Sequence, residues 1–507
     1  MGNETELKFE ASPQDLKRLK TSQLLHRRMG KPVKEDNLIS VYFDTDKRKL
    51  KRNGFSLRVR HLGDKRVQTI KTQGAGGPFI RGEWEHKIKS GVPDLRAARG
   101  TALAPILTKK VKRSLKPIFE TRVHRTTVPW RKNGSRIEVV FDEGKIHAGQ
   151  KSAQINEVEL ELKRGKALDL FKTARLIRKH VPIKLALRTK SERGYDLTSD
   201  NAALSSRAER IELQRNTSTA EAFRIIGRSV LRHVVANAAA VQTADPEGVH
   251  QMRVGLRRLR TLTWLFKELI GGEQTERIKA EIKWLTGELG PARDLDVYVR
   301  STIEPSKGTV SPRQGVQELA SELAARRASA FANAKRAIAS PRYQRFAFET
   351  FEWIEIGNWA KHSDSAGGRA VKRFAKDILT QRTTKVMKKG KKLQKLNPGQ
   401  RHKLRIALKK LRYTTEFFES LFKGSTAAKH RLEFAGHLKD LQDGLGALND
   451  IAVHQQMATR LAGHKKKPAP AFAAGVVSGR EQSEIEPLLK GAHTAARKFA
   501  HARRFWS

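Results

Sequence analysis

The stretch DPEGVHQMRVGLRRLR, residues 245–260, has a similar counterpart 152 residues later, NPGQRHKLRIALKKLR at residues 397–412. Each copy opens with a helix-capping residue and a proline, Asp245-Pro246 and Asn397-Pro398, so both predict the start of a helix. At about 100° per residue, the helix places four basic or histidine side chains of each copy in one stripe. The stripes are His250, Arg253, Arg257 and Arg260 in the first copy, and His402, Arg405, Lys409 and Arg412 in the second.

The two stripes predict a binding surface for a polyanion, because neighbouring cations repel one another unless an anion lies on them. A single basic helix face is usually a solvated surface, and a lone histidine is usually a packing residue. Two matched copies favour binding over that ordinary interpretation. Asp294 and Asp450, in matching segments downstream, can pair with the stripe arginines and fix their orientation.

The composition is strongly basic. Lys and Arg total 102 against 52 Asp and Glu, a formal net charge of +50. This excess indicates an anionic partner: nucleic acid, polyphosphate, an anionic membrane or a small phosphorylated substrate. Aromatic platforms for single-stranded nucleic acid are scarce beside the stripes, where Trp264 and Tyr413 lie, so we do not expect nucleic acid as a specific partner.

Cysteine is absent, which excludes disulfides and thiolate metal sites. No apolar run reaches the ~18 residues of a membrane span, and the first residues lack the pattern of a secretory signal. We therefore expect no membrane partner and a cytoplasmic location, with polyphosphate granules as a further place in the cell.

The hydrophobic period divides the chain into two domains and a linker. Residues 1–200 alternate with the period of strands, residues 201–217 form a polar linker, and residues 218–507 have the period of helices. The duplicated pattern predicts an internal repeat in the helical domain, at about 218–365 and 366–507. Asn53-Gly54 and Asn133-Gly134 predict hairpin turns. Helices are expected around residues 246–270, 274–289, 314–339, 342–361, 368–390, 398–422, 428–446 and 479–503, with loops at 301–313 and 465–470.

In the strand half, at least five strands carry ionisable side chains on their polar face. For one strand alone, this face usually meets water. Here acidic pairs such as Glu157/Glu159 accompany basic pairs such as Arg58/Arg60, and carboxylates two apart on a strand are only about 7 Å from each other. Such pairs predict a site for a hard cation, Mg²⁺ or Mn²⁺, with the basic residues holding phosphate. If the sheet closes into a barrel, the ionisable face lies inside, and helices can cover the apolar face outside.

The strand motifs, taken in order, resemble the CYTH domain, the triphosphate tunnel metalloenzyme fold. They are Glu4-Thr5-Glu6-Leu7-Lys8 (the ExExK signature), Arg58-Val59-Arg60, Ile70-Lys71-Thr72, Arg81 to Glu85, Glu138 to Asp142, Glu157 to Glu161 and Thr189 to Tyr195. ExExK alone is a weak signal, whereas the ordered set over about 200 residues is specific. The resemblance implies an eight-stranded antiparallel β-barrel tunnel that binds triphosphate with a divalent metal and hydrolyses it.

The resemblance also implies roles for single residues. The implied catalytic residues are Glu4, Glu6 and Lys8, and the implied metal ligands are Glu4, Glu6, Glu138, Asp142, Glu157 and Glu159. The implied substrate-binding residues are Lys8, Arg58, Arg60, Lys71, Arg81, Arg125 and Lys190, with Glu83, Glu85, Arg122 and Arg193 of second rank. The expected reaction is metal-assisted phosphoryl transfer to water, in which metal offsets charge and basic residues position the substrate. Glu4→Gln or Glu159→Gln is then expected to abolish metal-dependent phosphate release from tripolyphosphate.

The duplicated basic helices resemble the CHAD domain, a helical module of two pseudo-symmetric four-helix bundles found beside CYTH domains. The resemblance covers about residues 215–507 and implies inorganic polyphosphate as the ligand, gripped between the two helices. The second copy has Lys409-Lys410 where the first has Arg257-Arg258, which removes bidentate guanidinium forks. The predicted fold class is α+β in two domains, a barrel tunnel followed by two helical bundles.

The leading functional hypothesis is a metal-dependent inorganic triphosphatase whose helical domain binds polyphosphate. Two alternatives stay open: a non-catalytic protein that binds polyphosphate granules, and an adenylate cyclase or thiamine triphosphatase of the same fold. The acidic pairs favour catalysis, since a pure anion binder gains nothing from them.

Overall fold

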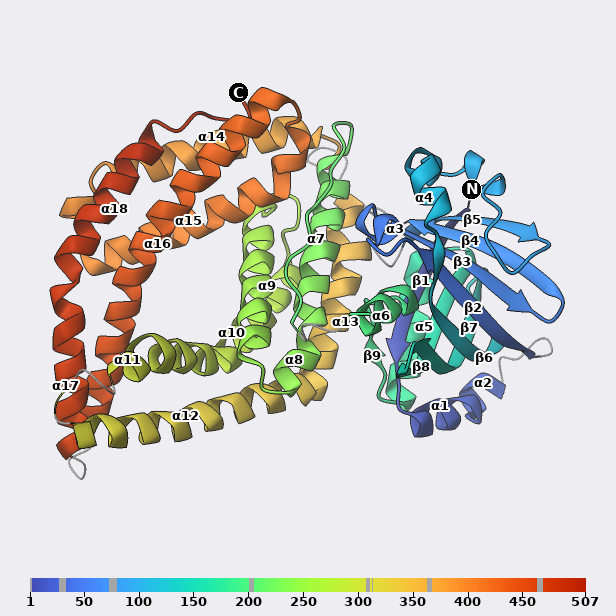
Figure 1. Ribbon diagram of the computed structural model, residues 1–507, viewed down its shortest axis with the longest axis horizontal. Helices are drawn as coiled ribbons and strands as arrows, with labels where there is room; N and C mark the ends of the chain where they lie inside the picture. The colour runs from blue at the N-terminus through green and yellow to red at the C-terminus, as the bar shows by residue number, and fades with distance from the viewer. Residues whose placement is uncertain are drawn as a thin grey trace. The chain divides into compact units, whose positions relative to one another are not determined.

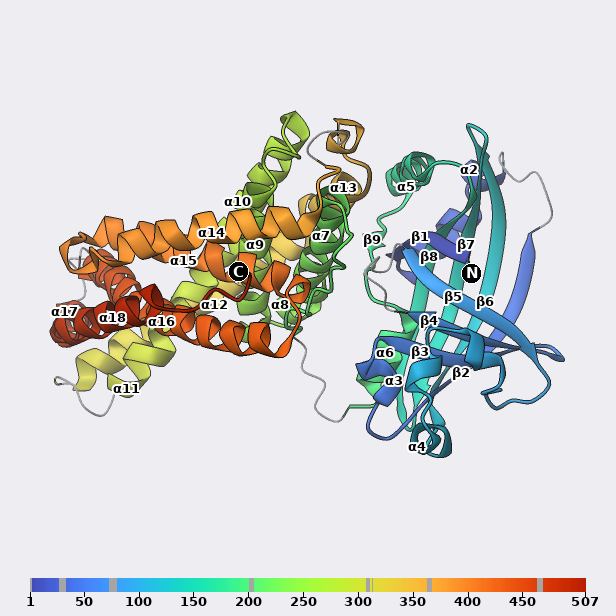
Figure 2. The same ribbon diagram turned by 90° about the horizontal axis from the view of Figure 1, so that it is seen from above.

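The computed structural model describes residues 2–26, 33–72, 80–199, 205–306, 311, 313–362, 367–462 and 468–507. The chain separates into two compact units (Figures 1 and 2). The β unit contains Met1–Leu204 with Ala347–Ile356, and the helical unit contains Ser205–Phe346 with Gly357–Ser507.

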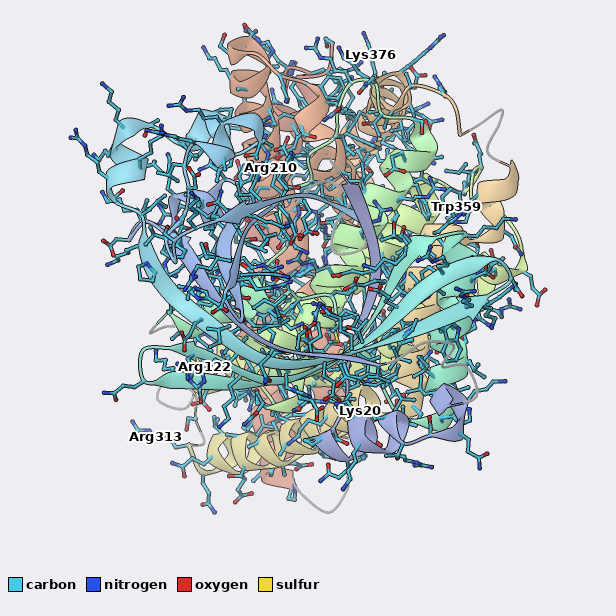
Figure 3. All side chains as sticks on the ribbon, turned by 90° about the vertical axis from the view of Figure 1, so that its right-hand side faces the viewer. Lys20, Arg122, Arg210, Arg313, Trp359 and Lys376 are labelled. Carbon is cyan, nitrogen blue, oxygen red and sulfur yellow. The ribbon has the colours of Figure 1, made fainter. Side chains whose placement is uncertain are left out.

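The β unit is a nine-stranded antiparallel sheet in the order β5-β4-β3-β2-β6-β7-β8-β1-β9. Its strands are β1 (Gly2–Glu10), β2 (Lys34–Asp44), β3 (Phe55–Leu62), β4 (Lys65–Thr72), β5 (Ile80–Ile88), β6 (Lys116–Lys132), β7 (Ser135–Ala148), β8 (Lys151–Arg164) and β9 (Lys184–Leu185). β1 also pairs with β5, from Gly2 to Thr5, which links the two ends of the eight-strand series. Figure 3 shows the strands curving around a space filled with side chains.

Six helices accompany the sheet: α1 (Pro13–Lys20), α2 (Gln23–His26), α3 (Lys49–Arg52), α4 (Lys109–Arg113), α5 (Ala167–His180) and α6 (Lys190–Leu197), with 3-10 turns η1 (Ala97–Gly100) and η2 (Ala104–Ile106). α5 packs on β8 and β1. The middle of β8 is buried on both faces, with Glu157, Glu159 and Glu161 on one side and Val158 and Leu160 on the other. Because successive side chains of a strand point to opposite faces, β8 separates an apolar layer from a charged interior.

One predicted hairpin turn is confirmed and the other is wrong. Asn133-Gly134 has φ values of 49° and 77° and joins β6 to β7. Asn53-Gly54 instead follows α3, and β3 turns into β4 at Gly63, where φ is 56°. The Asp44 carboxylate accepts the backbone N–H groups of residues 50 and 51, which favours a helical turn at this point.

The segment Thr189 to Tyr195, which was grouped with the strand motifs, is helical. α6 begins at Lys190 because Thr189 and Glu192 form a capping box, in which each side chain accepts the other residue's backbone N–H. The antiparallel sheet itself confirms the predicted fold of the first half, with β9 as a short additional strand.

The helical unit confirms the predicted all-helical second half. Its helices are α7 (Thr219–Ala236), α8 (Ala238–Gln242), α9 (Pro246–Leu265), α10 (Glu273–Tyr298), α11 (Glu304–Ser306), α12 (Arg313–Ala339), α13 (Pro341–Ile356), α14 (Val371–Gly390), α15 (Pro398–Phe418), α16 (Ser425–Ala462), α17 (Pro468–Ser483) and α18 (Ile485–Ala500). Shorter turns are η3 (Val299–Ile303), η4 (Asn358–His362), η5 (Leu393–Lys395) and η6 (Glu419–Leu421). The last ten residues of α13 belong to the β unit.

The two repeats have matching contacts. α9 packs on α7 and α10, α15 packs on α14 and α16, and α9 and α15 contact each other. Ser218 and Ala370, which are 152 positions apart, form an antiparallel backbone bridge. A contact between equivalent positions is expected where a pseudo-twofold axis passes between the two repeats.

Two expected loops are partly helical. α10 continues into a π-helical turn at Val299–Ile303 and then into α11, where a loop at 301–313 was expected. α16 extends to Ala462, and α17 begins at Pro468 inside the loop expected at 465–470, of which residues 465–467 lie outside the described residues. Among the helices described, none is both long and apolar enough to cross a membrane.

Candidate functional site

The interior of the β unit gathers five buried carboxylates from three strands. They are Glu6 on β1, Asp142 on β7, and Glu157, Glu159 and Glu161 on β8, and we call them the carboxylate cluster. Strand register explains their meeting. Asp142 lies opposite Glu157 across β7 and β8, and Glu6 lies opposite Glu161 across β1 and β8. Residues that are opposite in an antiparallel pair share a face, so alternate positions of β8 converge with both neighbouring strands.

An ammonium group occupies the middle of this cluster. Lys190 Nζ lies 2.6 Å from Asp142 Oδ2, 2.5 Å from Glu157 Oε2 and 2.8 Å from Glu159 Oε1. Lys190 is the first residue of α6, so the capped end of that helix fixes where its side chain starts. The short α6 thus carries a cation into the sheet interior.

Two further cations balance the cluster from neighbouring strands. Arg125 on β6 donates to both carboxylate oxygens of Asp142, at 2.7 and 2.6 Å, and to Glu159 at 3.0 Å. Lys8 Nζ lies 2.7 Å from Glu159 Oε1. Charge-assisted and bidentate contacts of this kind are among the strongest polar interactions in proteins.

These opposite charges keep one another ionised. Burial alone would raise the pKa of Glu159, but Lys190, Lys8 and Arg125 hold that pKa well below its ordinary value. Burial alone would lower the pKa of Lys190, but the carboxylates around it hold that pKa well above its ordinary value. At neutral pH Glu159 is therefore ionised, and it is a weak proton acceptor.

The oxygen donors of the cluster suit a hard divalent cation. One oxygen each from Asp142, Glu157 and Glu159 lie within 4.8 Å of one another, and the same holds for Glu6, Glu159 and Glu161. Carboxylate oxygen is the ligand that Mg²⁺ and Mn²⁺ prefer. Because the two groups share Glu159, they can hold one ion or two adjacent ions.

Arg58 and Arg60 on β3, both predicted phosphate ligands, have less compensation than Lys190. Arg58 Nη1 donates to the Tyr42 hydroxyl at 3.5 Å. The nearby charge of Arg58, followed by burial and Arg125, lowers the pKa of Arg60 to about 10. A guanidinium that is destabilised by neighbouring cations favours an anionic ligand.

Other predicted residues are placed as follows. Lys71 Nζ lies 3.1 Å from Glu83 Oε1, and Glu85 accepts a hydrogen bond from Thr69 at 3.1 Å. The side chains of Glu4 and Arg81 lie outside the described residues.

Two predicted residues lie outside the carboxylate cluster, one of them beside it. Glu138 is opposite Glu161 across β7 and β8, and Lys163 Nζ lies 3.2 Å from Glu138 and 2.6 Å from Glu161, although Glu138 belongs to neither group of three carboxylates. Arg122, labelled in Figure 3, is exposed, and its Nε donates to Glu120 at 2.7 Å.

The predicted ligand set omits Glu161, although Glu161 belongs to one group of three. Its signal was present in the sequence, since it continues the alternation of Glu157 and Glu159 along β8. Arg193, ranked second in the prediction, donates to Glu157 at 2.8 Å from α6. That contact joins residues 36 positions apart and has no local sequence signal.

The helical unit carries the two predicted basic stripes on α9 and α15. The Asp245 side chain accepts the backbone N–H groups of Glu247 and Gly248, and Asn397 forms a capping box with Gln400. Both caps satisfy N–H groups that a helix start leaves unpaired. The opposite faces of the two helices bury Met252, Leu256, Leu259, Leu262, Leu404, Leu408 and Leu411.

The two predicted pairs between stripe arginines and downstream aspartates are present. Arg253 Nη2 lies 3.5 Å from Asp294, and Arg405 Nη2 lies 3.8 Å from Asp450. Each aspartate is about half exposed, so it orients its arginine and neutralises only part of the stripe.

The stripe histidines have different neighbours in the two repeats. His402 Nδ1 lies 2.7 Å from Asn449 Oδ1. The pKa of His250 is lowered to about 4 by burial and by the guanidinium of Arg293. His250 is therefore neutral at physiological pH.

The stripes differ from the sheet interior in their charge balance. Burial, together with the neighbouring charges of Arg405 and Arg257, lowers the pKa of Lys409 to about 7. Burial is also the first cause that lowers the pKa values of Arg253 and Arg405. Around the carboxylate cluster, Lys8, Arg125 and Lys190 are held charged by carboxylates, whereas the cations of α9 and α15 lack enough counter-charge. A surface of this kind favours an anionic ligand.

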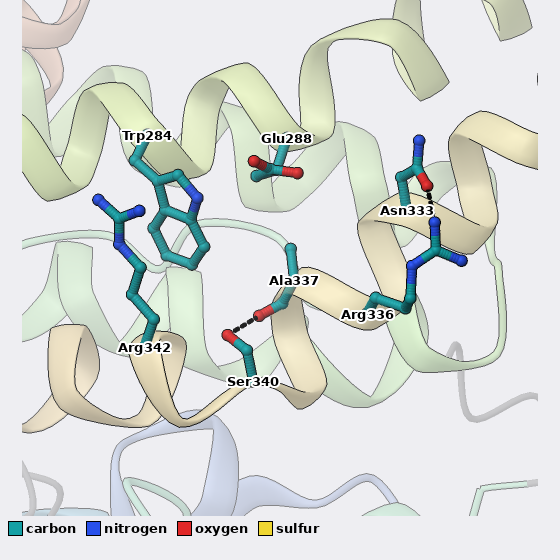
Figure 4. A pocket seen from close by; sticks show the side chains of 7 residues that line it. All are labelled: Trp284, Glu288, Asn333, Arg336, Ala337, Ser340 and Arg342. Carbon is teal, nitrogen blue, oxygen red and sulfur yellow. Dashed lines mark hydrogen bonds between the residues drawn. The ribbon is translucent and has the colours of Figure 1, made fainter.

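A shallow pocket in the helical unit lies apart from the stripes (Figure 4). Trp284 on α10 lines it together with Arg342 on α13, whose guanidinium is 4.2 Å from the centre of the indole ring and pairs with Glu281. The Glu281 carboxylate thus balances the charge of Arg342.

Comparison with protein families divides the chain in the same way. The sequence pattern of the CYTH domain matches residues 2–195, and that of the CHAD domain matches residues 225–459. An inorganic triphosphatase of Haemophilus influenzae is 32% identical over 163 residues, which is 32% of this chain and 46% of that relative. The match thus spans about half the length of this curated relative.

Two solved structures are similar to parts of the chain. The crystal structure of the CHAD domain from the plant Ricinus communis shares 29% identity and a TM-score of 0.52, over 59% of this chain and 97% of that chain. A Hippeastrum protein described by a dominant triphosphatase activity shares 17% identity and a TM-score of 0.30, over 38% of this chain and 95% of that chain.

Proposed function

Because the chain joins a CYTH domain at residues 2–195 to a CHAD domain at residues 225–459, we propose that it is a metal-dependent triphosphatase that also binds inorganic polyphosphate. The proposed substrate of the β unit is tripolyphosphate or a related triphosphate. The proposed domain limits are 1–200 and 218–507, joined by a linker at 201–217.

One observation carries the catalytic proposal: five buried carboxylates share an interior with lysine and arginine side chains. A site that only held an anion would gain nothing from buried carboxylates, which repel phosphate and are costly to bury. A site that holds a metal and phosphate together needs both kinds of group. The relative from Haemophilus influenzae, an inorganic triphosphatase, supports the same assignment.

The proposed metal ligands come from the carboxylate cluster: Glu6, Asp142, Glu157, Glu159 and Glu161. A divalent ion held there supplies Lewis-acid stabilisation of charge on the phosphate oxygens. Arg125 keeps Asp142 in place through two hydrogen bonds.

The cations of the β unit bind and orient the triphosphate. Arg58, Arg60 and Lys71 are the proposed phosphate ligands on β3 and β4, and their charges offset the negative charge that develops on the transferred phosphoryl group. Since the pKa of Glu159 is well below its ordinary value, Glu159 is a poor general base. The proposed rate enhancement therefore comes mainly from positioning and electrostatics. Water attacks the terminal phosphorus, the bond from that phosphorus to the bridging oxygen breaks, and orthophosphate and pyrophosphate are the products.

A phosphate-release assay tests this proposal. Purified protein is given tripolyphosphate with Mg²⁺, with Mn²⁺, or with a chelator. We expect orthophosphate release that requires the metal. Equal release in the chelator would refute the metal dependence, and no release under any condition would leave the non-catalytic polyphosphate binder as the better assignment.

The helical unit is proposed to hold polyphosphate on the stripes of α9 and α15. The incompletely balanced charges of Arg253, Arg405 and Lys409 support this proposal. Competition with single-stranded DNA at matched phosphate concentration tests it. If polyphosphate does not displace the DNA, the surface is a general nucleic-acid site and the proposal fails.

A further inference from the structure

The pseudo-twofold relation of the helical unit makes a comparison of equivalent positions possible. The offset of 152 residues relates Arg258 to Lys410, Arg260 to Arg412, and Trp264 to Glu416. The first two pairs conserve positive charge between the repeats. The third pair places an indole where the other repeat has a carboxylate.

In the second repeat, the carboxylate of Glu416 balances the charge of neighbouring arginines. Arg412 Nε, on the same helix α15, lies 3.1 Å from Glu416 Oε1. Arg258 Nε, on α9, lies 4.0 Å from Glu416 Oε2. One carboxylate therefore lies between a cation from each helix.

In the first repeat, the equivalent position is Trp264, which brings no carboxylate to the neighbouring cations. Lys410 Nζ, equivalent to Arg258, lies 4.5 Å from the centre of the indole ring. Arg382 of α14 lies 3.9 Å from that centre. The indole faces attract cations but carry no net charge, so the ring gathers them without neutralising them.

Four cations converge here, and we call them the Trp264 patch: Arg260, Arg382, Lys385 and Lys410. Burial lowers the pKa of Lys410, and the charges that lower it further are those of Arg382, Arg260 and Lys385. Over the parts of the helical unit that the structure describes, no carboxylate forms an ion pair with any of the four. Arg382 Nε is buried without a hydrogen-bond partner.

We propose that the Trp264 patch is a second phosphate-binding site, in which an external phosphate takes the place that Glu416 fills in the other repeat. The inference rests on the proposed polyphosphate binding and deepens it. Arg260 belongs both to the α9 stripe and to the Trp264 patch, so the two surfaces are continuous. A long polyphosphate chain can contact the stripe and the patch at the same time, whereas tripolyphosphate contacts only a part of this combined surface. The patch therefore favours long chains.

Condensed phosphate fits this site better than a nucleic acid does. Base stacking needs an open aromatic face. Here Arg382 and Lys410 already lie over the Trp264 ring. What the patch offers to a ligand is its guanidinium and ammonium groups, which recognise phosphate oxygens.

Trp264→Glu tests the inference, because it gives this repeat the carboxylate of the other. Binding of long-chain polyphosphate and of tripolyphosphate is measured by calorimetry for the full chain. We expect Trp264→Glu to weaken long-chain binding by about tenfold, the factor that 1.4 kcal/mol represents, and to leave tripolyphosphate binding unchanged. Trp264→Phe keeps an aromatic ring and is expected to behave as wild type.

A second variant tests the patch without changing Trp264, so that its result does not depend on the packing of the indole ring. Arg382→Gln with Lys385→Gln removes two cations of the patch and is expected to weaken long-chain binding to a similar extent. Its salt dependence is expected to become shallower, because fewer counterions are released on binding.

The outcomes separate the two proposals. If wild-type protein binds no polyphosphate, the proposed function fails. If it binds long chains and both Trp264→Glu and the double variant bind them equally well, the Trp264 patch is not a site. If single-stranded DNA depends on the patch as strongly and displaces polyphosphate, the assignment to condensed phosphate is overturned.

Discussion

Raising the pH is expected to weaken polyphosphate binding, with Lys409 as the responsible group. Burial, followed by the charges of Arg405, Arg257 and Arg412, lowers the pKa of Lys409 to about 7, and Asp450 opposes them. A phosphate bound against this ammonium favours the charged form, and it moves the pKa back toward the ordinary value of 10.5. Binding and protonation of Lys409 are therefore linked.

The direction and size of the effect follow from this linkage. Below pH 7 the free protein already carries the proton, so the affinity changes little. Above pH 7 each binding event takes up a proton, and the affinity falls by up to about tenfold per pH unit. Because Lys409 is partly exposed and salt screens its charge, we expect a total loss of about tenfold between pH 7 and pH 9.

The assay is an equilibrium titration with long-chain polyphosphate from pH 6 to pH 9 at constant ionic strength. Long chains are used because the terminal phosphates, which have an ionisation near pH 6, are then a small part of the ligand. Lys409→Arg keeps its charge at all these pH values and is expected to give a flat profile. Lys409→Met is expected to give a flat profile at lower affinity. His250, whose pKa is lowered to about 4, is neutral in the free protein over this pH range.

A flat wild-type profile would refute this reasoning. So would a Lys409→Arg profile that falls in parallel with wild type, because the titrating group would then lie elsewhere.

Three further substitutions have defined outcomes. Lys190→Met should tighten Mn²⁺ binding in the absence of triphosphate, because it removes an ammonium group that lies within 2.8 Å of three carboxylates. Direct titration measures this affinity, and an unchanged value would show that the Lys190 ammonium does not compete with the metal. Gly194→Ala should lower the thermal stability of the β unit by about 1–3 kcal/mol, since the new methyl would lie 2.2 Å from the Phe119 ring, and should leave polyphosphate binding intact; a wild-type melting curve would contradict this. Asp245→Ala should cost about 1 kcal/mol in the unfolding of the helical unit through loss of the α9 cap, and calorimetry that finds no change would show that the cap is dispensable.

The architecture was largely predictable because its hydrophobic periods are local. Alternation along β8 and the duplicated stripes on α9 and α15 both describe residues that are close in sequence. The loop expected at 465–470 was wrong in part because the Ala- and Gly-rich segment from Pro468 to Ser483 lacks a clear apolar stripe, although it packs as α17.

For the segment that forms α6, the capping residues predict the structure better than the order of the strand motifs does. Thr189 and Glu192 have the spacing of a capping box, and this signal outweighs the order of strand motifs in which the segment was first placed. The same capping logic gave the starts of α9 and α15 correctly.

The ion pairs of the site could not be derived from the sequence. Lys190 and Asp142 are far apart along the chain, and their contact depends on the register of β7 with β8 and on the path of α6. A register error of one residue would have turned each predicted ligand to the opposite face. Glu161 is different, because extending the alternation by one step would have included it.

The most direct test of the proposed triphosphatase compares two glutamates on neighbouring strands. Glu159 contacts Lys8, Lys190 and Arg125 in the sheet interior, whereas Glu143, next to Asp142 on β7, pairs with Lys20 of α1. Both are changed to Gln, and the rate of metal-dependent phosphate release from tripolyphosphate is measured for each folded variant. We predict that Glu159→Gln loses at least about a hundredfold in rate, in the range of one electrostatic group in an active site, while Glu143→Gln stays near wild type. Near wild-type turnover by Glu159→Gln would contradict the assignment of the sheet interior as the catalytic site.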